Sequence, residues 1–184
     1  VQDPNGELWI AKFPSKHDEG NVGAWEKVAH DLARMCGLNV PESKIEHFSK
    51  DGSTFLVKRF DREGRRRLHF SSAMTMLGKT DGASAVDGTS YLDLVDFIKS
   101  NSIQPNKDLE ELWNRLVFSI LISNTDDHLR NHDFMLSENG WKLSPLFDVN
   151  PNPLGKELSL NITEDNNLKQ LSLALDTAKY YNLP

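Results

Sequence analysis

The stretch SNTDDHLRN, residues 123–131, carries more information about fold and chemistry than any other part of this sequence. It is polar and charged, yet it follows an apolar segment predicted as a helix and precedes an apolar segment predicted as a strand. Asp126 and Asn131 are five positions apart, which is the spacing of the Asp and Asn of a protein-kinase catalytic loop. Such an Asp orients the proton of the attacking hydroxyl, while the Asn binds a magnesium ion on the phosphates. The stretch therefore predicts a loop that catalyses phosphoryl transfer.

A second acidic residue is expected further along the chain, because a single Asn cannot hold a hard cation alone. The sequence LFDV supplies Asp148, which follows Asn131 by 17 residues (148 − 131 = 17). Asn131 and Asp148 are therefore candidate magnesium ligands, and Asp126 is the candidate base. In this sequence a Phe precedes the acidic residue and no Gly follows it, unlike the usual order in kinases.

A lysine for the α- and β-phosphates is the third element that a kinase requires. The sequence WIAK, ending at Lys12, has the form of the Val-Ala-Ile-Lys strand of kinases. On the predicted strand, Lys12 shares a face with Leu8 and Ile10, so its ammonium group needs a charged partner. Glu26, early in the next predicted helix, is the candidate for that partner.

Each of these residues also has a simpler interpretation. Asp126 and Asp127 could cap a turn, Asp148 could form an Asx turn, and Lys12 could be a solvated strand residue. The order of the motifs along the chain favours the nucleotide-binding interpretation, because four weak signals follow one another as in a kinase. A transition-metal site is the remaining alternative for a nearby cluster, which consists of His128, His132 and Asp133.

The apolar periodicity places strands early in the chain and most helices later. This order predicts an α+β fold with a small sheet-bearing part and a larger helical part. Strands are predicted over 7–13, 44–48, 54–60, 133–136 and 141–143, and helices over 21–36, 70–77, 90–101, 106–123 and 168–180.

The composition narrows the class of protein. The 184 residues carry 21 Lys and Arg against 27 Asp and Glu, a net charge of −6 that argues against nonspecific coating of nucleic acid. The single cysteine, Cys36, excludes a disulfide framework and a cysteine-based zinc ribbon. The apolar runs are far shorter than the roughly 20 residues that span a bilayer, so we expect a cytoplasmic protein without membrane contact.

Taken together, five strings between positions 9 and 151 resemble the HipA family of bacterial serine/threonine protein kinases, the toxins of toxin–antitoxin modules. They are WIAKFPS with a following VGAWE, GLNVPES, LVKRFDR, NTDDHLRN and LSPLFDVNP. The resemblance implies a protein-kinase-like core of two lobes. Residues 1–77 would form part of a small, strand-rich ATP-binding lobe with a hinge near 57–62, and residues 78–184 would form an incomplete helical catalytic lobe.

The resemblance also implies roles for individual residues. Lys12, braced by Glu26, would bind ATP, and Asp126 would be the catalytic residue. Asn131 and Asp148 would be the Mg²⁺ ligands. The hinge-like segment, with Val57, Arg59 and Phe60, would hold adenine through backbone groups and an aromatic side chain.

Family members transfer the γ-phosphate of ATP to a serine of a protein, an aminoacyl-tRNA synthetase in the characterised cases. They bind a helix-turn-helix antitoxin of the HipB type, so DNA would be contacted only indirectly. The chain opens inside a predicted hairpin, and we therefore expect it to be a truncated fragment that lacks the glycine-rich phosphate loop. Whether such a fragment is active in isolation is left open by the sequence. The alternatives are a catalytically inactive kinase-like module that docks to an antitoxin or another protein, a small-molecule phosphotransferase and a metal-dependent hydrolase.

One local segment departs from the overall acidity. Residues 58–67 contain six cations, Arg65 among them, against two acidic residues. The segment is either a solvated hairpin end or a contact for an acidic partner, a phosphate or DNA.

Overall fold

The computed structural model describes residues 1–64 and 66–184, so that Arg65 of the basic segment lies outside the described residues. The chain forms two compact units, one of residues 1–67 and 145–151 and the other of residues 68–144 and 152–184. The expected division at residues 77 and 78 therefore differs from the unit boundary, because 68–77 group with the second unit and 145–151 with the first. The predicted α+β class is confirmed by the strands and helices described next.

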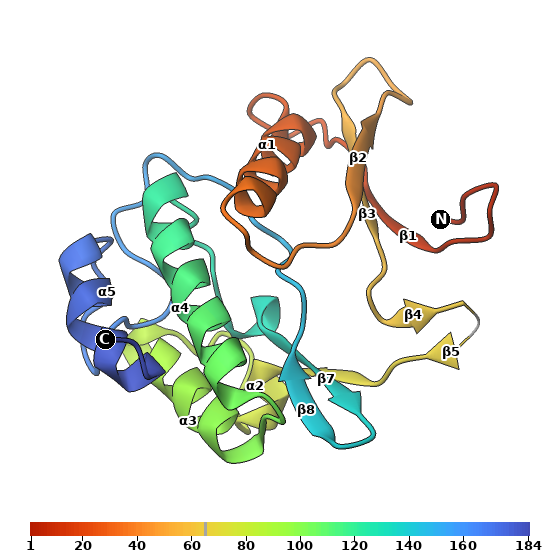
Figure 1. Cartoon of the computed structure of the whole chain (residues 1–184). Coiled ribbons are helices and arrows are strands. Elements are labelled where there is room, and N and C mark those ends of the chain that lie inside the picture. Colours follow the sequence, from red (N-terminus) through yellow and green to blue (C-terminus); the bar gives the residue numbers. More distant parts are fainter. Residues whose placement is uncertain (65) are drawn as a thin grey trace. The chain divides into compact units, whose positions relative to one another are not determined.

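The first unit contains a three-stranded antiparallel sheet with the order β1-β3-β2. Its strands are β1 (Trp9–Lys12), β2 (Ser43–Glu46) and β3 (Thr54–Lys58), and helix α1 (Val22–Met35) packs against β2 and β3 (Figure 1). Lys12 lies opposite Phe55 in the register, so both side chains point to the same face of the sheet. This register directs Lys12 toward the face on which His30 of α1 packs against Phe55.

Helix α1 begins and ends close to the predicted residues 21 and 36. The side chain of Asn21 accepts a hydrogen bond from the N–H of Ala24, and Gly37 follows the helix with a φ of +83°. The first turn lies so close to β3 that a Cβ at Gly23 would be 2.3 Å from the carbonyl oxygen of Ser53. Only glycine permits this close packing, which fixes where the helix starts on the sheet.

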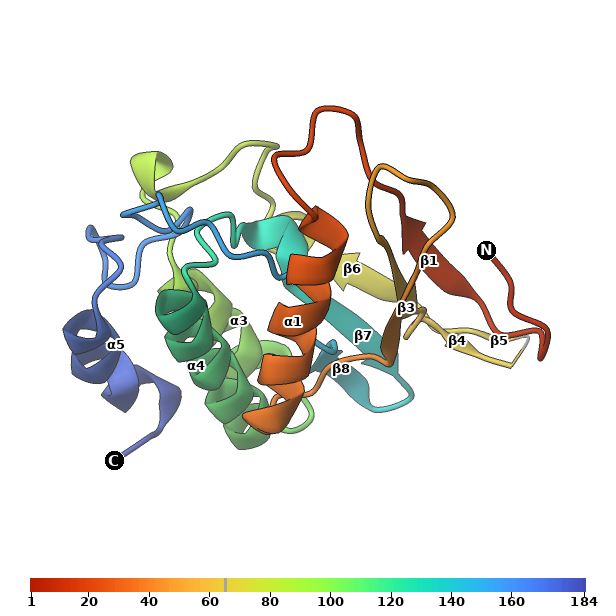
Figure 2. The ribbon, with the colours of Figure 1, turned by 90° about the horizontal axis from the view of Figure 1, so that it is seen from above.

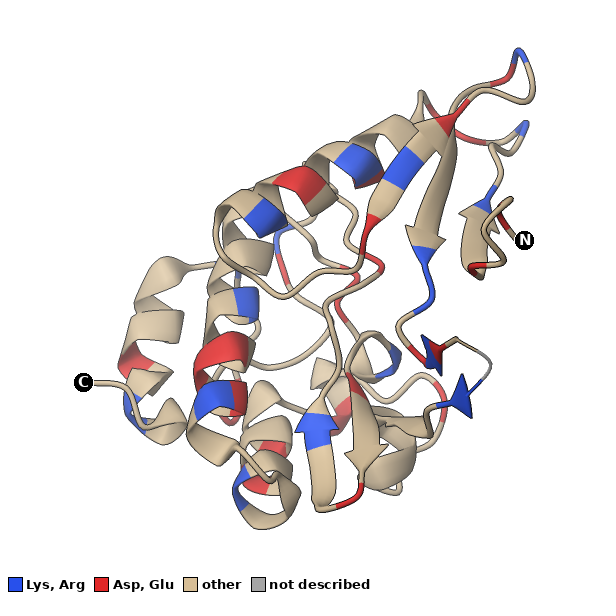
Figure 3. Cartoon of the chain, turned by 45° about the vertical axis from the view of Figure 1, so that its right-hand side comes forward, with Lys and Arg blue, Asp and Glu red and all other residues tan. Residues whose placement is uncertain are grey.

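A short hairpin follows β3. The strand ends at Lys58, two residues before the predicted end, and the chain then forms β4 (Arg62–Glu63) and β5 (Arg66–Arg67). In this pairing Arg62 lies opposite Arg67. Blue segments, which mark Lys and Arg positions, colour parts of the ribbon in both strands of this hairpin (Figure 3).

The second unit contains another three-stranded antiparallel sheet, with the order β6-β7-β8. Its strands are β6 (Phe70–Ser72), β7 (Asp133–Ser137) and β8 (Gly140–Leu143). The predicted helix over 70–77 is therefore wrong at its start, and only Ala73–Met76 is helical, as α2. Pairing of β6 with β7 across some 60 residues, for example Ser71 with Phe134, overrides the local helical preference.

Three longer helices complete this unit. They are α3 (Tyr91–Asn101), α4 (Pro105–Ile122) and α5 (Leu171–Thr177), and α4 packs against both α3 and α5 (Figure 2). The predicted helix at the end of the chain thus begins three residues later than expected and continues as a 3₁₀ turn. Their apolar faces surround one core, to which Leu94, Ile98, Leu112, Leu116, Phe134 and Leu160 contribute fully buried side chains.

The loops of the second unit contain short 3₁₀ turns. One, Ala85–Asp87, lies between α2 and α3, and another, Leu129–Asn131, lies in the catalytic-loop candidate. Helix α4 ends at Ile122, and the next residue, Ser123, has a φ of +61° that turns the chain away from the helix axis. None of the helices in the described part of the chain has the length and apolar character that a bilayer crossing requires.

Candidate functional site

The first unit brings together three of the residues that the sequence indicates, Lys12, Glu26 and Asp148. The Nζ atom of Lys12 donates a hydrogen bond to Oε1 of Glu26 at 2.6 Å and another to Oδ1 of Asp148. Lys12 comes from the end of β1, Glu26 from α1, and Asp148 from the segment 145–151 that returns to this unit. One cation therefore joins three elements that are distant in the sequence.

Burial and charge oppose one another in this triad. Glu26 is 2% exposed, and burial raises the pKa of its carboxyl group, although the Lys12 ammonium offsets part of that rise. Burial alone lowers the pKa of Lys12, but the charges and hydrogen bonds of Glu26 and Asp148 outweigh it and raise that pKa. Lys12 is accordingly held as a cation beside a buried carboxylate.

Asp148 has a backbone conformation that side chains rarely adopt. Its φ is +56°, in the left-handed region that Asp and Asn tolerate better than most other residues. Such conformations concentrate at functional sites because the surrounding structure must impose them. The side chain of Asp148 is 42% exposed, so it can bind a ligand while it contacts Lys12.

Neighbouring residues hold the segment around Asp148 in place. The N–H of Leu146 donates to the carbonyl oxygen of Asn39 at 2.7 Å, and Leu146 and Val149 are buried. The ring of Phe147 packs on that of Phe60, with centroids 5.6 Å apart. These contacts hold Asp148, with its left-handed backbone conformation, between two packed neighbours, Phe147 and Val149.

The hinge-like residues have different surroundings from one another. Val57 is buried in the central strand, where it lies opposite Ile10 and Ser43. The N–H of Arg59 donates to the carbonyl oxygen of Leu8 at 2.9 Å. The remaining expected contact, Phe60, lies against Phe147, and adenine binding by these residues stays a prediction.

The guanidinium group of Arg59 forms a two-pronged ion pair. It donates to both carboxylate oxygens of Asp61, at 2.8 and 2.6 Å, and Arg62 contacts the same carboxylate. Burial by itself raises the pKa of Asp61, but Arg59 and Arg62 outweigh it and lower that pKa. Two cations of the basic segment thus share one carboxylate, so a net positive charge remains at this group of three side chains.

The second unit holds Asp126 and Asn131 in one short loop, residues 124–132. The Nδ2 atom of Asn131 donates to the backbone oxygen of Asp126 at 3.0 Å, and the N–H of His128 donates to the same oxygen at 3.1 Å. Asp126 is exposed, whereas Asn131 is buried. The candidate base, Asp126, is thus exposed to solvent, and the hydrogen bond from the side-chain amide of Asn131 joins the two ends of the loop.

A buried polar cluster, which the sequence patterns did not predict, adjoins this loop. Asp127 accepts a hydrogen bond from the hydroxyl of Tyr91 at 2.5 Å and lies 3.1 Å from Nε2 of His132. Ser119 of α4 also contacts Asp127, at 3.4 Å. One available signal was that Ser119 interrupts the apolar face of its helix, since a polar residue on a core face needs a partner.

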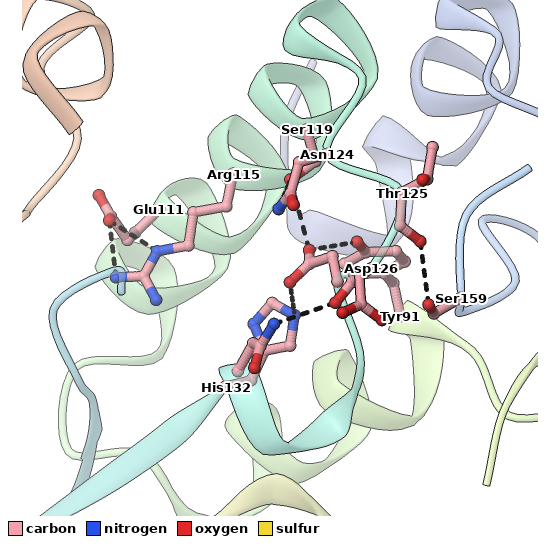
Figure 4. Close-up of polar contacts among 11 residues, drawn as sticks. Tyr91, Glu111, Arg115, Ser119, Asn124, Thr125, Asp126, His132 and Ser159 are labelled. Carbon is pink, nitrogen blue, oxygen red and sulfur yellow. Dashed lines mark hydrogen bonds and ion pairs between the residues drawn. The ribbon is translucent and has the colours of Figure 1, made fainter. Parts of the chain in front are cut away.

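Arg115 is a second polar side chain of α4 that is fully buried. Its Nη2 donates to the carbonyl oxygen of Ser144 at 2.6 Å, and its Nε donates to Glu111 at 2.9 Å (Figure 4). Burial lowers the pKa of Arg115, and Glu111 offsets part of the change. This pair connects α4 to the end of β8 and supports the helix from which the loop departs.

Among the described residues, no group of three His, Cys, Asp or Glu side chains is arranged to hold a metal ion. The alternative of a transition-metal site at His128, His132 and Asp133 is therefore not supported. The magnesium candidates have the right chemistry, since Asp148 offers a carboxylate and Asn131 an amide oxygen. Mg²⁺ prefers oxygen ligands and completes its shell with water and phosphate. Each of these side chains therefore offers a ligand type that suits the ion, and a magnesium site formed by both stays a prediction.

Comparison with known proteins identifies relatives along nearly the whole chain. The family description "HipA-like C-terminal domain" matches residues 1–182. A Haemophilus influenzae protein named "Putative kinase" is 27% identical over 154 residues, and the Shewanella oneidensis serine/threonine-protein kinase toxin HipA is 24% identical over 185 residues. These alignments include 76% and 91% of the chain but only 45% and 40% of the relatives, so the chain spans less than half of their length.

Two solved structures share the fold. The Shewanella oneidensis HipA in a complex with HipB and operator DNA aligns with a TM-score of 0.78 at 20% identity, over 96% of this chain and 46% of that one. The Helicobacter pylori proinflammatory kinase CtkA aligns with a TM-score of 0.70 at 18% identity, over 96% of this chain and 74% of that one.

Proposed function

The chain belongs to the family of the HipA-like C-terminal domain, and on this premise we propose that it is the core of an ATP-dependent serine/threonine protein kinase. The reaction is the transfer of the γ-phosphate of ATP to a serine of a protein in the presence of magnesium. The observation that carries the proposal is the triad of Lys12, Glu26 and Asp148. A buried carboxylate that braces a strand lysine beside an exposed Asp is the arrangement that kinases use to hold phosphates and metal.

The residues divide the work as follows. Lys12 binds the α- and β-phosphates, and Glu26 keeps the ammonium group in place. Asp148 and Asn131 supply oxygen ligands to Mg²⁺, which neutralises the charge that develops on the phosphates. Asp126 orients the serine hydroxyl and accepts its proton as the oxygen attacks phosphorus and ADP leaves.

Two further assignments complete the proposal. Adenine binds along the hinge-like segment, at Val57, Arg59 and Phe60, and the phosphate acceptor is a protein serine, with an aminoacyl-tRNA synthetase as the first substrate to test. The partner is a small antitoxin of the HipB type, which is supported by the complex of the Shewanella HipA with HipB and operator DNA. DNA is then contacted only through that antitoxin.

The decisive experiment compares Asp126→Asn with Asp148→Asn in the natural protein that contains this chain. Asp126→Asn is expected to lower phosphate transfer about 100-fold or more, the usual contribution of a general base, while Mg-ATP binding is retained. Asp148→Asn, which suits the left-handed backbone, is expected to weaken Mg-ATP binding about 10- to 100-fold through loss of one charged contact. Transfer is measured with labelled ATP, and binding by calorimetry with and without magnesium.

Two results would contradict the proposal. If Asp126→Asn transfers phosphate as fast as the wild type, Asp126 is not the general base. If magnesium has no effect on ATP binding in either the wild type or Asp148→Asn, Asp148 is not a magnesium ligand. A wild-type protein that binds Mg-ATP but transfers no phosphate supports the inactive docking module instead.

A further inference from the structure

Adjacent acidic residues in the candidate loop point in opposite directions. Asp126 is exposed, whereas Asp127 is 1% exposed. A general base must come within hydrogen-bond reach of the proton that it abstracts. Asp127 faces the interior of the second unit and cannot meet a substrate hydroxyl there, so the two carboxylates must have different roles.

Side chains from α3, from α4 and from the last residue of the loop itself meet the carboxylate of Asp127. Tyr91, the first residue of α3, donates its hydroxyl to Oδ2 at 2.5 Å. Ser119 of α4 lies 3.4 Å from the same oxygen, and His132, directly before β7, places Nε2 3.1 Å from Oδ1. Figure 4 labels Tyr91, Ser119 and His132 among the side chains that it draws around this cluster. Oδ2 therefore accepts hydrogen bonds from Tyr91 and Ser119, and Oδ1 lies within ion-pair distance of His132.

The donors are themselves rigidly placed. Tyr91 is fully buried, and its N–H donates to the carbonyl oxygen of Asn161 at 2.9 Å. Helix α3 begins at Tyr91 with a capping box formed by Ser90 and Asp93. Tyr91 is therefore held in place by contacts outside the loop, and its position does not depend on that of the loop.

We infer that Asp127 is a positioning residue, which anchors the loop to α3 and α4 so that Asp126 is held at the reacting hydroxyl. The inference rests on the proposed function of Asp126. Its physical basis is that Asp126 and Asp127 share one peptide unit, so fixing the side chain of Asp127 fixes the backbone of Asp126. The bond from Asn131 to the oxygen of Asp126 closes the loop on its other side. Small misplacements of a catalytic group are costly, which gives the anchor its function.

The charge state of the cluster agrees with this role. Burial alone raises the pKa of Asp127, but His132 and the hydrogen bond from Tyr91 outweigh it, so that pKa lies below the ordinary value. Burial and the neighbouring Asp127 raise the pKa of Tyr91 well above its usual value. The hydroxyl thus remains a donor and the carboxylate an acceptor.

The test uses Tyr91→Phe, Asp127→Asn and the double variant in the natural protein that contains this chain. Tyr180→Phe, which removes a hydroxyl from a more exposed tyrosine, is the matched control. Tyr91→Phe removes the shortest hydrogen bond to the Asp127 carboxylate without altering the loop sequence. It is expected to lower kcat about 10- to 100-fold while KM for ATP changes less than about threefold, because it touches neither ATP nor the reacting atoms. The double variant is expected to be no slower than Asp127→Asn, since both changes remove one interaction.

Hydrogen–deuterium exchange of residues 124–132 provides a second readout that requires no activity. Tyr91→Phe and Asp127→Asn are expected to raise deuterium uptake in this loop, and Tyr180→Phe is expected to leave it unchanged. If the wild type transfers no phosphate, the proposed function fails, and the exchange data alone then decide whether Asp127 anchors the loop.

Two outcomes would overturn the inference. The first is a Tyr91→Phe protein with lowered Tm but unchanged kcat and unchanged loop exchange, which would make the cluster merely structural. The second is loss of transfer in Asp127→Asn together with retained transfer in Asp126→Asn, which would make Asp127 the base.

Discussion

Lys12 is the side chain on which the charges of the first unit converge. It contacts two carboxylates, and one of them, Glu26, is almost completely buried. Removing one partner of a buried ion pair leaves an uncompensated charge, which usually costs more than the intact pair contributes. The stability of this unit should therefore depend on Lys12 even in the absence of ATP.

This dependence leads to a prediction for Lys12→Met. The variant is expected to lose about 1–3 kcal/mol of unfolding free energy, less than a fully buried pair would lose because Lys12 is partly exposed to solvent. Lys12→Met combined with Glu26→Gln is expected to recover part of that loss, since the unpaired carboxylate is gone. Urea denaturation of the three proteins measures the effect, and a double variant less stable than Lys12→Met would contradict it.

Helix α1 contributes a buried histidine as well as Glu26. His30 is fully buried against Phe55, and burial, with smaller contributions from Arg34, Lys12 and Lys27, lowers its pKa from 6.5 to about 4. The folded state therefore keeps His30 neutral at pH values where the unfolded chain binds a proton. Stability from this group is present above pH 6.5 and is lost as the pH falls toward 4.

We accordingly expect His30→Leu to reduce the acid sensitivity of the first unit. Between pH 6.5 and pH 4 the wild type should lose on the order of 3 kcal/mol more unfolding free energy than the variant. Leucine is similar in size and needs no hydrogen bonds, so the packing against Phe55 is retained. Denaturation at pH 7, 5.5 and 4.5 tests this, with His17→Leu at a surface position as the control. Parallel stability profiles for wild type and His30→Leu would count against the assignment.

At the scale of the whole molecule, the chain leaves the second unit after Ser144 and returns to the first unit for residues 145–151. Because the chain returns to the first unit, Asp148 contacts Lys12. Leu146 is the main anchor of the segment, because its side chain is buried and its N–H bonds to Asn39. The chain path, and not local sequence, thus assembles the triad.

Leu146→Ala should therefore affect stability and ligand binding together. Truncating a buried leucine costs about 2–5 kcal/mol, and the released segment should weaken Mg-ATP binding because Asp148 loses its fixed position. Leu154→Ala is the matched control, since Leu154 is 90% exposed. Thermal unfolding and calorimetry with Mg-ATP measure the two effects. Full affinity in a destabilised Leu146→Ala protein would show that Asp148 does not depend on this anchor.

Local signals predicted most of the elements well. Helix α1 was predicted within one residue at each end, because its apolar spacing, the Asn21 cap and Gly37 are all local. The start of the predicted helix over 70–77 failed because Phe70–Ser72 pair with a distant strand. The two short strands of the basic hairpin were missed, since strands of two residues leave no periodic pattern.

The sequence by itself determined the family, the α+β class and the order of the candidate residues. These properties depend on residue types and on spacing along the chain, which a sequence shows directly. Only the tertiary structure decided which candidates meet. Lys12 contacts Glu26 and Asp148, which are 14 and 136 positions away, and such contacts arise from packing and chain path. The structure likewise separated Asp126 from Asp127, because burial is a property of the folded chain and identical neighbouring side chains differ only in the direction in which they point.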